Sequence, residues 1–214
     1  MAAATPQRTR ATSADLDEQI VDAARRLLRD TGEGFTIQQL VEEAGVALQT
    51  FYRHFASKDQ LLLAVLERTV SESCAQMERA TASIDDPVAR LRYIVTRPLR
   101  LLQAVAPAEA QLTTREHFRL QQLYPDAVAR ATDAFAMLVL GTIEDARVGG
   151  LLVPPAVEWD AARDAARDAW MVTELVMTTF HHYAFTGLGD GSDGDAVIEH
   201  LWRFCFAAIG GRAQ

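Results

Sequence analysis

The chain has 214 residues, 49% of them hydrophobic, and a formal net charge of −8. This length allows one domain or two small ones with a real hydrophobic core. There is no apolar run of about 18 residues and no apolar stretch behind the first methionine, so we expect a cytoplasmic protein without a membrane span or a secretory leader. The two cysteines lie far apart in sequence, and we expect both to be reduced.

The N-terminal segment is small and polar and contains two arginines. We expect a flexible arm there; the alternative is an arm whose Arg8 and Arg10 reach the DNA minor groove or phosphates. A first helix is expected from Asp15 to about Asp30, with Glu18 completing a capping box at its start. This helix has an apolar face at helical spacing, which predicts that it packs against the elements that follow.

Residues 35–61 carry the clearest local signals of the chain. Thr36 is a good N-cap, and Gln39 stands three residues later, where its side chain can reach back to the Thr36 N–H. Gly45 suits the left-handed conformation that ends such a helix. A second helix is expected from Ala47 to His54. Two short helices joined by a tight turn indicate a helix-turn-helix DNA-binding motif.

A helical wheel separates the second of these helices into two faces. Three apolar residues fall together and are expected to face the core: Leu48, Phe51 and Phe55. The opposite face is rich in hydrogen-bond donors, as a helix that reads the major groove requires: Gln49, Thr50, Tyr52 and Arg53. A third helix is expected to be capped by Ser57 and to continue to about Ala82.

This block resembles the N-terminal domain of the tetracycline-repressor (TetR) family. The resemblance spans about residues 16–66 and rests on Phe35-Thr36, Ala44-Gly45-Val46, Thr50-Phe51-Tyr52-Arg53-His54-Phe55 and Ser57-Lys58. It implies an all-α protein, with a three-helix helix-turn-helix domain followed by a larger α-helical domain for effector binding and dimerisation. The expected parts are an arm (1–14), the DNA-binding domain (15–62) and the effector-binding and dimerisation domain (63–214).

Wheel geometry and the resemblance together assign roles on DNA. Base edges are expected to be contacted or approached by Gln38, Gln49, Thr50 and Arg53. Phosphates are expected to be contacted by Tyr52, His54 and Lys58. The resemblance implies a ligand-released repressor that binds a palindromic double-stranded operator as a homodimer.

The acidic balance argues against this interpretation. Residues 1–60 contain 7 basic and 9 acidic residues, a balance of −2. DNA binding needs local positive potential and not global charge, and Arg53, His54 and Lys58 can supply it on one face. The alternative is a helical small-molecule-binding or interaction protein whose reader no longer binds DNA. An enzyme is a distant third, because no phosphate loop or nucleophile elbow is present.

Downstream, only helical patterns appear. Helices are expected from Pro87, from Ala108 to Leu123, from Pro125 to Val148, over 157–186 and over 194–209. Pro98 is expected to kink or split the first of these helices. In the last helix a seam for helix–helix packing follows i, i+4, i+7, i+11: Val197, Leu201, Phe204 and Ala208. The resemblance implies that the last two helices form the dimer interface.

Aromatic and methionine residues of the larger domain are expected to enclose a hydrophobic or amphipathic effector, as the resemblance implies. The residues assigned to this pocket are Leu102, Phe118, Met137, Trp170, Met177 and His181. Polar groups are available from Arg115, His117, Thr173 and Thr178. Adjacent His181 and His182 point about 100° apart on a helix, so they do not readily share a metal ion. We expect no metal, no cofactor and no catalytic residue.

Overall fold

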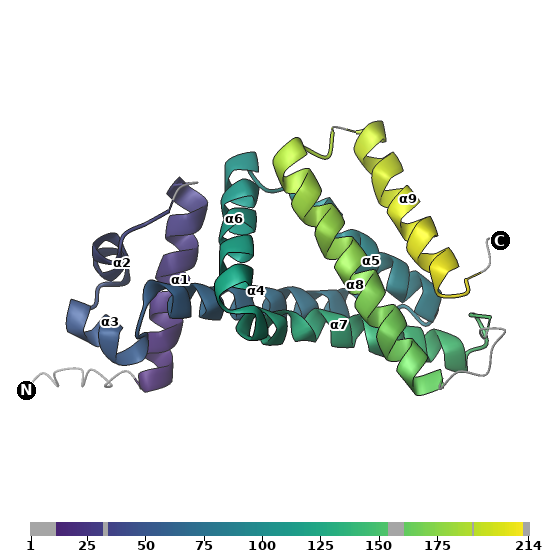
Figure 1. Cartoon of the computed structure of the whole chain (residues 1–214), viewed down its shortest axis with the longest axis horizontal. Coiled ribbons are helices and arrows are strands. Elements are labelled where there is room, and N and C mark those ends of the chain that lie inside the picture. Colours follow the sequence, from purple (N-terminus) through teal and green to yellow (C-terminus); the bar gives the residue numbers. More distant parts are fainter. Residues whose placement is uncertain (1–11, 32–33, 154–160, 190, 212–214) are drawn as a thin grey trace, which may run out of the picture. The chain divides into compact units, whose positions relative to one another are not determined.

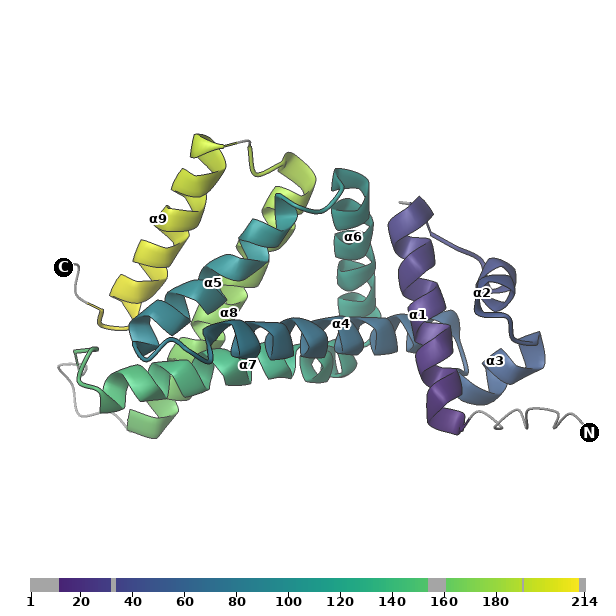
Figure 2. The ribbon, with the colours of Figure 1, turned by 180° about the vertical axis from the view of Figure 1, so that it is seen from behind.

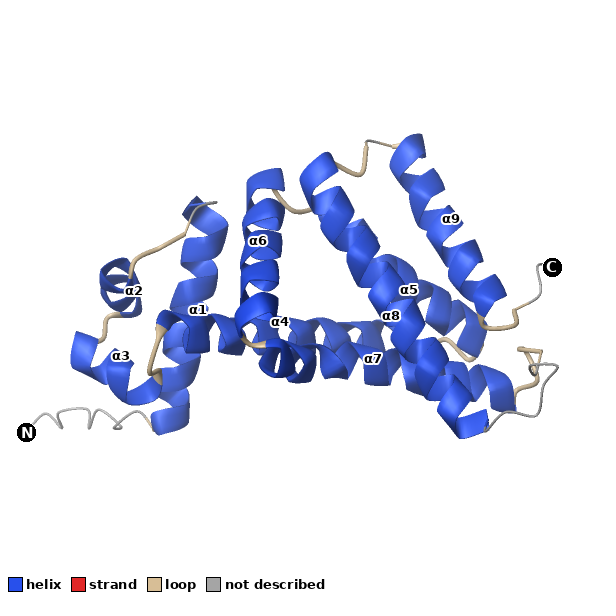
Figure 3. Cartoon of the chain, in the orientation of Figure 1, coloured by secondary structure: helices blue, strands red, loops and turns tan. Residues whose placement is uncertain are grey.

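The computed structural model describes residues 12–31, 34–153, 161–189 and 191–211. These residues form helices throughout (Figures 1 and 3), and the described ranges hold no strand beyond an isolated bridge between Leu152 and Gly211. The helices are α1 (Ser13–Thr31), α2 (Ile37–Ala44), α3 (Leu48–His54), α4 (Lys58–Thr81), α5 (Pro87–Leu102), α6 (Pro107–Leu123), α7 (Pro125–Val148), α8 (Ala161–Thr186) and α9 (Ser192–Ala208). The all-α prediction is confirmed. None of the described helices has the length and apolar content needed to cross a membrane.

The chain divides into two compact units, Met1–Val65 and Leu66–Gln214, and α4 runs from the first into the second. The first unit begins with a capping box that differs from the predicted one. The Thr12 N–H donates to the Asp15 carboxylate (2.8 Å), and the Asp15 N–H donates to the Thr12 hydroxyl (3.2 Å). Helix α1 therefore starts before Asp15, because Thr12 and Asp15 satisfy each other's free N–H groups.

The predicted signals of α2 are confirmed. The Thr36 hydroxyl accepts from the Gln39 N–H (3.2 Å), while the Gln39 side chain accepts from the Thr36 N–H (2.8 Å). Phe35 and Leu40 on either side of this cap are buried. Gly45 ends the helix at φ 65°, in the left-handed region, where a residue with a Cβ pays a steric cost.

Helix α3 buries only part of its predicted apolar face. Phe51 is fully buried and Phe55 is buried, but Leu48 is 45% exposed, so its predicted core position is wrong. Leu48 lies about 60° around the helix from Phe51. Phe55 follows the helix in extended backbone (φ −129°, ψ 114°), where a helical wheel no longer applies.

Three contacts between elements hold the first unit together, and the first of them holds α3 directly. The Asp17 carboxylate of α1 lies 2.6 Å from Nδ1 of His54, whose side chain is 6% exposed. The Lys58 ammonium donates to the Phe35 carbonyl and lies 4.5 Å from the centre of the Phe35 ring. In addition, the Gln19 side chain donates to the last carbonyl of α2, that of Ala44 (2.6 Å).

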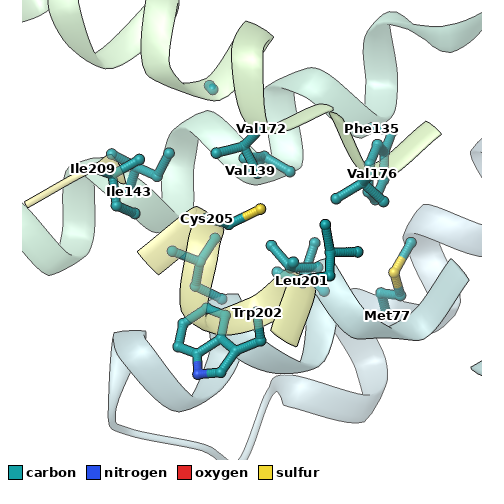
Figure 4. Packing of buried hydrophobic residues seen from close by; sticks show 14 of the residues in the cluster. Met77, Phe135, Val139, Ile143, Val172, Val176, Leu201, Trp202, Cys205 and Ile209 are labelled. Atoms are coloured by element: carbon teal, nitrogen blue, oxygen red, sulfur yellow. The ribbon is translucent and has the colours of Figure 1, made fainter. Parts of the chain in front are cut away.

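In the second unit, α5 packs against α7, α8 and α9, and α6 packs against α7 and α8. Helices α5, α7, α8 and α9 enclose a hydrophobic core, to which α4 contributes Cys74 and Met77; Met77 is labelled in Figure 4. Helix α5 continues through Pro98 to Leu102, so Pro98 does not split it. Its N-cap is Asp86, whose carboxylate accepts from the Val88 N–H (3.0 Å), with Pro87 in the first turn as predicted.

Helix α9 divides its apolar residues between the core and the surface. It packs against α5 (Figure 2). Its residues Leu201, Trp202 and Cys205 are buried in the core (Figure 4). Phe204 is 60% exposed. The predicted seam is therefore wrong as a single face, because Leu201 is already covered by the chain's own core. Burial also raises the pKa of the Cys74 and Cys205 thiols to about 11, and both cysteines are free.

We predict that Asp17→Ala destabilises the first unit by about 1–3 kcal/mol, because it leaves a buried imidazole nitrogen without its partner. The measurement is hydrogen exchange of the α3 amides, whose protection should fall. Asp22→Ala on the same helix is the matched control, since Asp22 makes a long, partly exposed pair with Arg25 (3.9 Å) and the His54 ring is not its partner. Equal losses of protection in the two variants would contradict a structural role for the His54–Asp17 contact.

Candidate nucleic-acid interface and ligand site

The outer face of α3 presents a compact set of polar side chains. Gln49, Tyr52 and Arg53 are exposed and Thr50 is half-buried, as the wheel predicted. These four residues line a shallow open hollow on the surface. Gln49 and Arg53, four residues apart, project from the same side of the helix. Their amide and guanidinium groups are the donors and acceptors that base edges in the major groove require.

The charge around this face is locally favourable, although the whole chain is acidic. Helix α3 contains no acidic residue and carries Arg53. The acidic residues of α2 are engaged within the unit: Glu43 pairs with Arg26 of α1 (2.7 Å), and Glu42 accepts from the exposed Gln38 (2.7 Å). The net charge of −8 therefore does not describe the surface that would meet DNA.

Two of the residues predicted to contact phosphates are held inside the unit. The His54 side chain is nearly buried and its Nδ1 lies 2.6 Å from the Asp17 carboxylate, while its phosphate contact stays a prediction. A helical wheel could not predict the contact between His54 and Asp17, because the two residues are 37 positions apart in sequence. Lys58 is half-buried against Phe35, so its ammonium is positioned by the start of α2.

The six residues predicted to bind an effector do not share one environment. His181 is buried and its ring centre lies 4.9 Å from that of Phe118, so α8 and α6 bring these two together. Met177 is half-buried and packs against the core, and Leu102 is half-buried at the end of α5. Met137 and Trp170, by contrast, are 57% and 60% exposed.

Two further residues join the contact between α6 and α8. The ring of His117, one of the predicted polar groups, lies 4.5 Å from that of His181. Thr114, which was not among the predicted polar groups, is almost completely buried one turn before His117 on α6. Its spacing of three residues from His117 was the available sequence signal. In the described ranges, no group of three His, Cys, Asp or Glu side chains is placed to hold a metal ion.

Comparison with known sequences places the first unit in a defined family. The sequence model described as "Bacterial regulatory proteins, tetR family" matches residues 20–65. The regulator AlkX of Mycobacterium tuberculosis is 27% identical over 180 residues, which are 73% of this chain and 84% of AlkX. The regulator YvaF of Bacillus subtilis is 36% identical over 64 residues, which are 30% of this chain and 33% of YvaF.

Solved structures share the whole fold at low sequence identity. A TetR-family regulator from Pectobacterium atrosepticum superposes with a TM-score of 0.71 at 16% identity, covering 97% of this chain and 100% of that chain. The regulator FadR from Bacillus subtilis, solved in complex with stearoyl-CoA, gives a TM-score of 0.68 at 15% identity, covering 92% of this chain and 99% of FadR.

The matched residues include those that build the exposed polar face of α3. Residues 20–65 include the capped α2, the Gly45 turn and the exposed side of α3. The relatives matched over the longer stretches of sequence are transcriptional regulators of the helix-turn-helix type. The chain belongs to the TetR family of bacterial DNA-binding transcriptional regulators.

Proposed function

We propose that the protein is a homodimeric repressor that binds a palindromic double-stranded operator in the cytoplasm and is released by a small hydrophobic or amphipathic effector. The observation that carries the DNA part is the exposed donor-rich face of α3, with Phe51 fully buried on its other side. A helix of seven residues is only marginally stable by itself in water. Contacts of its buried side must therefore hold it in place so that its exposed side can contact the bases.

The side-chain environments refine the expected roles on DNA. Gln49 and Arg53 are the residues for direct base contacts, and Thr50 and Gln38 approach the bases beside them. Tyr52, exposed next to Arg53, and Lys58, anchored at the start of α4, contact phosphates. His54 is assigned a positioning role, because its ring supports α3 from behind through Asp17.

The dimer is supported by the outer surface of the last two helices. A continuous stripe of α8 is exposed: Trp170, Met171, Glu174, Thr178, His182 and Phe185. On α9, Phe204 is exposed beside the small residues Ala207 and Ala208, which permit close approach of another helix. Large exposed apolar side chains mark interaction surfaces, and a second copy offers the same stripe in a two-fold arrangement.

The effector site is proposed between α5, α6, α7 and α8. Leu102, Met177 and His181 are kept in the proposed site, together with Phe118, which is 46% exposed but whose ring lies 4.9 Å from that of His181. Met137 and Trp170, which are 57% and 60% exposed, are left out of it. A fold neighbour, FadR, holds an acyl-CoA, which supports an apolar effector. Release requires the effector to bind the DNA-free shape more tightly than the DNA-bound shape. Helix α4 is the natural link, since it runs from the DNA-binding unit into the second unit.

We predict that Arg53→Ala weakens operator binding by about 1–3 kcal/mol and relaxes preference at one base pair, because a base contact is lost. The measurement is a mobility shift with the DNA upstream of the protein's own gene, followed by a scan of single base changes. Arg130→Ala on α7 is the matched control: it removes the same charge from an exposed residue of the second unit and should leave affinity unchanged. Unchanged affinity and preference in Arg53→Ala would overturn the assignment.

We predict that Phe204→Asp converts the dimer to a monomer, because it places a charge in an apolar interface, without loss of helical circular dichroism. Sedimentation velocity at micromolar concentration measures the change. Leu123→Asp is the control: Leu123 is 55% exposed on α6, outside the proposed interface, and this variant should remain dimeric. Leu201→Asp should instead unfold the second unit, because Leu201 is buried in the core. A monomeric wild type would refute the proposal.

A further inference from the structure

Two buried hydroxyls of the second unit lack hydrogen-bond partners. Among the described residues, Thr114 of α6 and Thr173 of α8 are 1% and 7% exposed, and neither Oγ1 atom has a partner. Other buried threonines use a simple solution, in which the hydroxyl donates to the carbonyl four residues earlier on its own helix. They are Thr81 (2.8 Å), Thr96 (2.8 Å) and Thr142 (2.9 Å). An unsatisfied buried hydroxyl costs about 1–3 kcal/mol, so these two positions call for an explanation.

Two imidazoles lie in the same helix pair, also without hydrogen bonds to described residues. The rings of His117 and His181 are 4.5 Å apart, and that of His181 also contacts Phe118 (4.9 Å) and Phe180 (5.6 Å). Burial, and secondarily the charge of His117, lowers the pKa of His181 to about 4; burial also lowers the pKa of His117. Both rings are therefore neutral near pH 7, and each offers one donor and one acceptor.

These four side chains follow one another along α6 and α8. The contacts Arg115–Phe185 (6.0 Å) and His117–His181 (4.5 Å) show that the two helices run antiparallel. At a rise of about 1.5 Å per residue, Thr114 lies about 4.5 Å along α6 from His117, and Thr173 lies about 12 Å along α8 from His181 in the opposite direction. Thr114, His117, His181 and Thr173 thus lie at successive levels of this helix pair, and the set is named here the polar track.

We propose that the polar track binds an apolar molecule through an uncharged hydroxyl or carbonyl group, and that it disfavours a carboxylate. Neutral threonine and histidine side chains can both donate and accept, which suits an alcohol, phenol or ketone. A buried carboxylate requires a cationic partner, whereas both rings of the track resist protonation. Arg115, next to Thr114 on α6, is exposed over the Phe185 ring. This inference rests on the proposed effector function and names the ligand chemistry of that site.

The test uses three probes with matched apolar chains: decan-1-ol, decan-2-one and decanoate. Isothermal titration calorimetry on the full-length protein at pH 7.5 should show the alcohol and the ketone binding at least about tenfold more tightly than decanoate, since a charge pays desolvation without a counter-ion. Binding of decanoate with equal or higher affinity, or binding of neither neutral probe, overturns the proposal.

Matched variants locate the probe on the track. Thr114→Val and Thr173→Val keep the side-chain shape and should each weaken decan-1-ol binding about threefold to tenfold, without lowering Tm. Thr142→Val is the control, because its hydroxyl is already bonded to the Leu138 carbonyl, and it should leave binding unchanged. His181→Gln keeps a donor and an acceptor and should retain more affinity than His181→Leu. Equal effects of all three valine variants would contradict the track.

The track and the effector function can fail separately. The operator mobility shift is repeated with each probe, for the wild type and for Thr173→Val. If a probe releases DNA from both proteins equally, the effector function stands and the track is wrong. If a probe binds the track, as the valine variants report, but never releases DNA, the track stands and release by ligands of this chemistry is refuted.

Discussion

The protein depends on holding a short, uncapped helix in place from one side. Helix α3 has seven residues and begins after Ala47, which supplies no capping bond, so its own hydrogen bonds cannot keep it formed. Its stability comes from the buried Phe51 and from the His54–Asp17 contact to α1. Because neither contact uses Gln49, Tyr52 or Arg53, these exposed residues remain available to DNA.

Internal bonding of acidic side chains explains how a chain with a net negative charge can bind an anionic partner. Around the reading face, acidic groups are used as internal acceptors: Asp17 for His54, Glu43 for Arg26 and Glu42 for Gln38. Acids of the second unit similarly join helices, as in the Arg147–Asp168 pair (2.6 Å) between α7 and α8. The net charge of the chain therefore includes acidic residues that bond within the fold. The sign of the electrostatic potential at α3 is set by a few nearby residues.

Sequence reasoning succeeded where structure is decided by neighbours in sequence. The Thr36–Gln39 box, the Gly45 turn, and Pro87 and Pro125 located helix ends to within a few residues, because capping and proline act locally. It failed where a side chain's partner is distant. Leu48 and Leu201 both fit apolar faces, yet one is exposed and the other buried, since periodicity shows that residues share a face but not what covers it. For His54, no local signal pointed to Asp17, and only the fold revealed that contact.

Each surface for which we propose a partner carries groups that the described part of the chain neither covers nor bonds. Most of the described second unit satisfies itself: its core is apolar, and Thr81, Thr96 and Thr142 bond within their own helices. In natural proteins, core packing and hydrogen bonding usually agree with the fold, and exceptions concentrate at functional sites. The exceptions in this chain differ from one another in their chemistry. Donors exposed on α3 suit bases, apolar side chains exposed on α8 and α9 suit a second copy, and buried unpaired hydroxyls suit a small neutral ligand. Because the three proposed partners differ in chemistry, the three surfaces can be tested independently of one another.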